Sequence, residues 1–112
     1  MSINNYQSDQ DSMLAGIVRK LIDAYNPEQV YLFGSKARGD ETGDSDYDLM
    51  LIVPNDASLQ KRHSRLAYQV LRGTGIAADI LVWTKSEFEK RLHVVASLPA
   101  TVIREGKLLY AA

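Results

Sequence analysis

Two aspartates separated by one residue, Asp46 and Asp48, stand at the start of the apolar segment 49–53. Side chains alternate along a β-strand, so a strand over 46–53 would place both carboxylates on one face. Neighbouring carboxylates repel each other unless a cation lies between them, and oxygen ligands of this kind suit Mg²⁺. The pair therefore predicts a divalent-cation site at the N-terminal end of a strand.

A glycine and a serine, Gly34 and Ser35, directly follow a second apolar segment, 30–33. Glycine lets the backbone approach a ligand closely, and amides at a turn that leads into a helix can hold phosphate. Lys36 and Arg38 are placed to meet phosphate oxygens, with solvated surface as the alternative for both. The turn therefore predicts a phosphate cradle beside the cation site.

Two other loop motifs resemble this stretch and are excluded. An EF-hand loop that begins at Asp44 would need Gly at its sixth position and Glu at its twelfth, where Leu49 and Asn55 stand. A Walker A loop would need Lys and then Ser or Thr where Asp40 and Glu41 stand. Neither a calcium loop nor a P-loop accounts for these residues.

A third aspartate, Asp79, interrupts the almost wholly apolar segment 77–83. An unpaired carboxylate inside a buried strand is costly, so Asp79 needs a partner. The cation site implied by Asp46 and Asp48 would supply one if the two strands are neighbours. Taken alone, Asp79 is equally compatible with an exposed position at a strand edge.

The remaining chain alternates helical and extended patterns around these residues, which predicts an α/β domain. Expected helices cover 13–25, 34–38, 58–71, 84–94 and 97–105, and expected strands cover 30–33, 46–53, 77–83 and 107–110. Thr84 and Glu87 form a capping box, Pro27 follows the first helix, and Gly106 ends the last. The order of the strands in the sheet does not follow from these patterns.

The composition limits the function classes. A chain of 112 residues with 46% hydrophobic residues makes one domain with a substantial core. Without cysteine there is no disulfide or thiolate site, which fits a cytoplasmic protein. A net charge of −1 and the lack of a long apolar run lead us to expect neither direct nucleic-acid binding nor a membrane segment.

Gly34-Ser35, ten intervening residues and Asp46-Tyr47-Asp48 resemble the signature of the DNA polymerase beta-like nucleotidyltransferase superfamily. The longer string GSKARGDETGDSDYDL resembles its smallest branch, the minimal nucleotidyltransferases, which are usually paired with a HEPN-domain protein. The resemblance covers the chain from about residue 30 to residue 110. It implies one minimal nucleotidyltransferase domain over 11–112 after a flexible 1–10, of α/β (α+β) class, with a mixed sheet and helices packed mainly on one face.

The resemblance also implies an activity, which is transfer of a nucleotide from ATP with two Mg²⁺ ions. It makes three acidic residues both catalytic groups and metal ligands: Asp46, Asp48 and Asp79. It assigns four residues to nucleotide binding: Gly34, Ser35, Lys36 and Arg38. Asp79 is a metal ligand, the general base or both. Members of the branch act as antitoxins that transfer AMP to a tyrosine hydroxyl of a HEPN ribonuclease toxin.

Two other functions remain open at this point. The chain could neutralise a partner by contact alone, although such a module has no physical need for three convergent carboxylates. It could also modify a small molecule such as an antibiotic, which would require an acceptor pocket that a domain of this size has little room to form.

Overall fold

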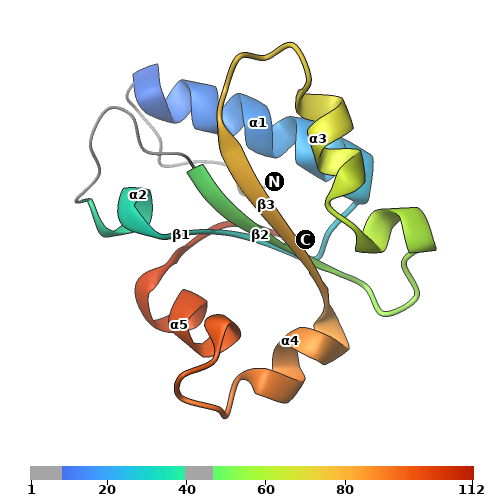
Figure 1. Cartoon of the computed structure of the whole chain (residues 1–112), viewed down its shortest axis with the longest axis vertical. Coiled ribbons are helices and arrows are strands. Elements are labelled where there is room, and N and C mark those ends of the chain that lie inside the picture. The colour runs from blue at the N-terminus through green and yellow to red at the C-terminus, as the bar shows by residue number, and fades with distance from the viewer. Residues whose placement is uncertain (1–8, 40–46) are drawn as a thin grey trace.

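The computed structural model describes residues 9–39 and 47–112, and in that part of the chain four strands form one sheet of order β3-β2-β1-β4 (Figure 1). The strands are β1 (Gln29–Phe33), β2 (Tyr47–Val53), β3 (Ala78–Thr84) and β4 (Lys107–Ala111). Strand β1 is antiparallel to β2 and to β4, whereas β2 and β3 are parallel. The sheet is therefore mixed, and the expected single α+β domain is confirmed.

Helices cover both faces of this sheet. They are α1 (Asp9–Tyr25), α2 (Ser35–Arg38), α3 (Arg65–Leu71), α4 (Lys85–Arg91) and α5 (Leu98–Glu105), with a 3₁₀ turn η1 (Leu59–Arg62). Figure 1 shows α1 and α3 above the sheet and α4 and α5 below it. The helices thus cover the two faces of the sheet more evenly than the expectation of helices mainly on one face. The strands carry apolar side chains on both faces, and both faces must be covered.

The larger core lies between the sheet and α1. Apolar side chains recur along α1 at helical spacing and pack on alternate residues of β2. These buried residues include Leu14, Ile17, Val18 and Leu21 of α1 and Leu49, Leu51 and Val53 of β2. The helix ends at Tyr25, where Asn26 adopts a left-handed backbone (φ 50°) ahead of Pro27.

A smaller core covers the opposite face. It consists of Tyr31, Met50 and Ile52 from the sheet with Phe88 of α4 and Val102 of α5. The rings of Tyr31 and Phe88 stack with their centroids 5.9 Å apart. These residues fix which face of β2 carries Met50, and by the two-residue period the same face carries Asp48.

The single helix predicted over 58–71 is wrong, because the chain forms η1 and α3 with a break at His63. The His63 backbone is extended (φ −127°, ψ 153°). The Tyr25 hydroxyl donates to the His63 carbonyl (2.5 Å), and the Ala67 amide donates back to the same hydroxyl (2.8 Å). A buried tyrosine from α1 thus takes the hydrogen bonds that a continuous helix would have used.

The predicted starts of the later helices are confirmed, whereas α4 ends at Arg91, three residues before the predicted end at 94. Thr84 and Glu87 form the capping box of α4, with backbone-to-side-chain distances of 3.0 and 3.2 Å. The Ser97 hydroxyl accepts from the Ala100 amide (3.2 Å) at the start of α5. At the other end of the chain α1 already begins at Asp9, within the segment expected to be flexible.

Candidate active site

Asp48 and Asp79 lie opposite each other on the two parallel strands at one side of the sheet. Asp48 of β2 pairs in register with Asp79 of β3. Neighbouring strands are about 4.8 Å apart. Alternation places the two side chains on the face of Met50 and Leu81, the residues two positions farther along. The strand adjacency that the sequence analysis required for a role of Asp79 is therefore present.

Both carboxylates are accessible from outside the core. Asp79 is exposed, because β3 is an edge strand, and Asp48 is half-buried. The cost of a buried, unpaired carboxylate therefore does not arise at Asp79. A ligand that approaches this end of the sheet can reach both side chains.

Gly34 brings the backbone of the predicted phosphate cradle directly against Asp48. Its backbone is left-handed (φ 76°), and a β-carbon on this residue would collide with Oδ2 of Asp48. The Gly34 carbonyl accepts from the amides of Ala37 (3.1 Å) and Arg38 (3.2 Å), which starts α2. The turn thus lies directly against the Asp48 carboxylate, which the sequence predicts to be a metal ligand.

Lys36 takes a different direction from the aspartates. Its Nζ lies 4.6 Å from the centroid of the Tyr47 ring. Tyr47 packs against the larger core, on the face of β2 opposite Asp48. Arg38 is exposed at the end of α2. Nucleotide binding by both basic residues remains a prediction, and the structure does not bring Lys36 to the side of Asp48 and Asp79.

Tyr47 is the residue of this region to which the sequence analysis gave no role. Its signal was its position between the two aspartates of the motif, which the two-residue period sends to the other face. Asp46 lies outside the described residues, and Ser35 is described by its backbone alone. The roles assigned to these two residues also remain predictions.

The chemistry of the described site fits a hard divalent cation. Asp48 and Asp79 offer carboxylate oxygens from adjacent positions, which is the donor set that Mg²⁺ prefers. Within residues 9–39 and 47–112 no cluster of three or more potential metal-ligating side chains occurs. A third protein ligand would have to come from outside the described residues, where the predicted ligand Asp46 lies.

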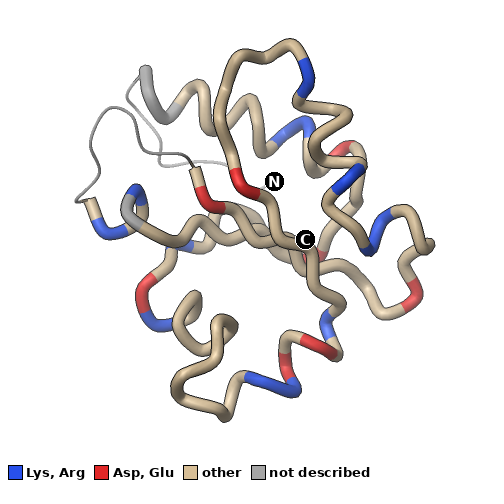
Figure 2. The backbone as a smooth tube through the Cα atoms, in the orientation of Figure 1, with Lys and Arg blue, Asp and Glu red and all other residues tan. Residues whose placement is uncertain are grey.

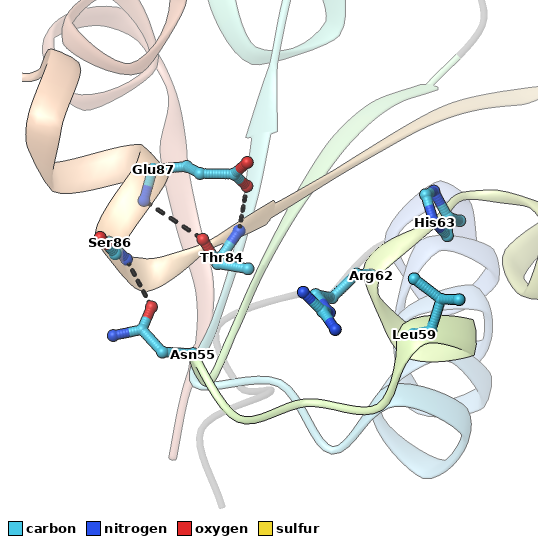
Figure 3. Close-up of a pocket in the computed structure, with 7 residues that line it drawn as sticks. All are labelled: Asn55, Leu59, Arg62, His63, Thr84, Ser86 and Glu87. Atoms are coloured by element: carbon cyan, nitrogen blue, oxygen red, sulfur yellow. Dashed lines mark hydrogen bonds between the residues drawn. The ribbon is translucent and has the colours of Figure 1, made fainter.

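A hollow of about 490 Å³ lies at the other end of the parallel strands (Figure 3). It is bounded by Thr84 at the end of β3, roughly 16 Å along the strand from Asp79. The side-chain oxygen of Asn55 accepts a hydrogen bond from the Ser86 amide (2.8 Å). Figure 3 shows Arg62 extending from η1 toward the β3–α4 junction. Asp48 and Asp79 stand at the start of the parallel pair and Thr84 at its end, so the hollow is separate from the site at Asp48.

Basic residues are spread over the described elements and do not gather on one. Figure 2 shows lysine and arginine positions on α1, α2, α3, η1 and α4 with acidic positions between them. No helix in the described part of the chain is long and apolar enough to cross a bilayer.

The family model for the nucleotidyltransferase domain matches residues 13–108. The chain belongs to the nucleotidyltransferase family. It is also similar to a proposed protein adenylyltransferase of Methanocaldococcus jannaschii, with 30% identity over 83 residues, which are 74% of this chain and 78% of that protein. The resemblance drawn from Gly34-Ser35 and Asp46-Tyr47-Asp48 is thereby confirmed.

Solved structures share the fold of this nucleotidyltransferase domain. One is a proposed nucleotidyltransferase from Sulfolobus solfataricus, with a TM-score of 0.60 and 22% identity over 89% of this chain and 78% of that one. Another is an MNT antitoxin in complex with a tri-AMPylated Shewanella oneidensis HEPN toxin, with a TM-score of 0.56 and 18% identity. That match covers 92% of this chain and 73% of the other.

Proposed function

We propose that this nucleotidyltransferase is an Mg²⁺-dependent protein adenylyltransferase, which transfers AMP from ATP to a tyrosine hydroxyl of a HEPN ribonuclease toxin and so acts as its antitoxin. The observation that carries the proposal is the in-register pair Asp48 and Asp79, with Gly34 packed against the Asp48 carboxylate. A phosphate-binding turn that touches a cation-binding carboxylate is the arrangement that a nucleoside triphosphate with Mg²⁺ needs.

The residues of the site have three roles in the transfer, which are metal binding, orientation of the phosphates and acceptance of a proton. Asp46, Asp48 and Asp79 would hold Mg²⁺, two ions in all, which when bound offset charge on the triphosphate and make the attacking hydroxyl more acidic. The amides at Gly34 and Ser35 orient the phosphates. Asp79, exposed at the sheet edge, accepts the proton of the tyrosine hydroxyl.

The bonds of the reaction balance without a covalent enzyme intermediate. The tyrosine oxygen forms a bond to the α-phosphorus of ATP. The bond from that phosphorus to the oxygen of the β-phosphate breaks, and pyrophosphate leaves. The product is tyrosine-O-AMP, and the tyrosine proton passes to Asp79 and then to solvent.

Three further observations support a protein acceptor. The relative from Methanocaldococcus jannaschii is named for adenylyl transfer to protein, and the Shewanella oneidensis antitoxin of the same fold is seen with an AMPylated HEPN toxin. Asp79 also lies exposed on an edge strand, where a hydroxyl carried by another chain can reach it. The scattered basic residues and the absence of cysteine suit a cytoplasmic enzyme that contacts neither nucleic acid nor a membrane.

The test is the intact mass of the HEPN-domain partner, sought in the neighbouring reading frame, after incubation with this chain, ATP and Mg²⁺. We expect a gain of one or more AMP units on the partner. Asp48→Asn and Asp79→Asn keep the size of each side chain and should lower the rate by at least roughly 100-fold. Asp56→Asn, at an exposed turn away from the site, is the matched control and should retain the full rate.

Three outcomes would count against the proposal. A stable complex in which the partner gains no mass would favour inhibition by contact alone. If neither a complex nor a mass gain is found, pyrophosphate release should be measured with small hydroxylated acceptors. A mass gain that survives Asp48→Asn would show that the site lies elsewhere.

A further inference from the structure

One contact near the site joins α2, which follows the predicted phosphate-binding turn, to β2, which carries Asp48. The ammonium of Lys36, in α2, lies over the ring of Tyr47, the first residue of β2, at 4.6 Å from the ring centroid. This is within the range of a cation–π interaction. The contact therefore ties the helix that follows the Gly34–Ser35 turn to the strand that carries Asp48.

The two ends of this tie lie beside the residues of the site. Gly34 immediately precedes α2, and Asp48 immediately follows Tyr47. On one face of β2 the Gly34 backbone touches the Asp48 carboxylate, and on the other face Lys36 covers Tyr47. A displacement of α2 relative to β2 would therefore change the gap between the turn and the carboxylate.

A second contact shows that α2 is held from the same side. Ala37, next to Lys36, is buried in the larger core with only 7% of its surface exposed. Ala37 fixes the depth of α2 in the core with its single methyl group, whereas the longer Lys36 side chain reaches across to Tyr47 of β2. The contact between Lys36 and Tyr47 adds a side-chain link between α2 and β2 on the same face.

We propose that Lys36 is a positioning residue for nucleotidyl transfer, which acts through the Tyr47 ring to hold the Gly34–Ser35 turn against Asp48 and does not contact phosphate. The proposal rests on the proposed function for the reaction it serves. The ring under the Lys36 ammonium lies on the face of β2 opposite Asp48, so the ammonium is directed away from the predicted metal site.

The test is a double-mutant cycle on AMP transfer. Lys36→Met removes the cation and keeps the stem, and we expect it to lower kcat about fivefold with less than a twofold change in the KM for ATP. Tyr47→Leu should have the same effect, and the double variant should be no slower than either single variant. Lys36→Arg should restore most of the rate, because guanidinium also binds aromatic faces.

Controls separate this role from folding. Lys20→Met, on the exposed side of α1, removes a lysine of the same kind and should leave kcat unchanged. If Tyr47→Leu does not fold, as shown by thermal unfolding, Tyr47→Phe keeps the ring and should retain the rate while Lys36→Met still lowers it.

A direct phosphate contact would give another pattern and would overturn the proposal. Lys36→Met would then raise the KM for ATP, Tyr47→Leu would leave it unchanged, and the effects of the two substitutions would multiply. Wild-type protein that transfers no AMP would instead refute the proposed function. In that case the dissociation constant for AMP-PNP with Mg²⁺ is measured, and a rise with Lys36→Met that Tyr47→Leu does not share would refute the positioning role.

Discussion

Gly34→Ala should separate the activity of this protein from its stability. Alanine at a left-handed position costs about 1–2 kcal/mol, and Gly34 has φ 76°. Its new β-carbon would also collide with Oδ2 of Asp48. Because that oxygen is at the end of a flexible side chain, the carboxylate can rotate away at little further cost in folding free energy. The rotation would, however, displace a predicted metal ligand.

The expected result is a small loss of stability and a large loss of rate. A destabilisation of 1–2 kcal/mol lowers the melting temperature of a domain of this size by about 4–12 °C. Displacement of a catalytic group by about 1 Å can cost roughly 100-fold in rate. We therefore expect Gly34→Ala to fold, to melt several degrees lower, and to lose about 100-fold in kcat/KM for AMP transfer.

Gly73→Ala provides the matched control. Gly73 is also left-handed (φ 86°), but a β-carbon there would meet no atom within 4 Å. It should lower the melting temperature by a similar amount and leave kcat/KM unchanged. Differential scanning calorimetry and the mass-based transfer assay measure the two quantities. If Gly34→Ala keeps its rate within threefold of wild type, the contact between Gly34 and Asp48 has no part in the reaction.

Two further predictions concern the scaffold. Tyr25→Phe leaves the Ala67 amide without its buried partner, so urea denaturation should show a loss of about 1–3 kcal/mol. Burial raises the pKa of Tyr25 above its ordinary value of 10.0. The stabilisation from the Tyr25 hydroxyl is therefore complete below pH 10.0 and is lost as the pH rises through the folded-state pKa. Equal alkaline destabilisation of wild type and Tyr25→Phe would contradict this. Thr84→Ala removes the hydroxyl that caps α4 and should cost about 0.5–2 kcal/mol at neutral pH. The Thr84 amide donates a hydrogen bond to the Glu87 carboxylate, which lowers the pKa of Glu87 below its ordinary value of 4.5. The stabilisation from this carboxylate is therefore present above pH 4.5 and is lost as the pH falls through the folded-state pKa. Glu87→Gln should abolish this loss of stability at acid pH.

Local patterns in the sequence were enough to find most of the helices and strands. The capping box at Thr84 and the turn at Gly34 depend on neighbours a few residues away, and both are present in the structure. The predicted helix over 58–71 failed for the opposite reason. Its break at His63 depends on the Tyr25 hydroxyl, 38 residues earlier in the chain, and no local preference encodes that contact.

The sequence by itself determined the family, through the residue types and spacing of Gly34-Ser35 and Asp46-Tyr47-Asp48, and it determined that neighbouring strand residues face opposite sides. Only the tertiary structure decided that β2 and β3 are adjacent and in the register that joins Asp48 to Asp79. It also decided that Lys36 lies over Tyr47, away from the carboxylates. The reason is physical: periodicity fixes where a side chain points along its own strand, whereas the choice of neighbouring strand depends on how the whole chain buries its apolar faces.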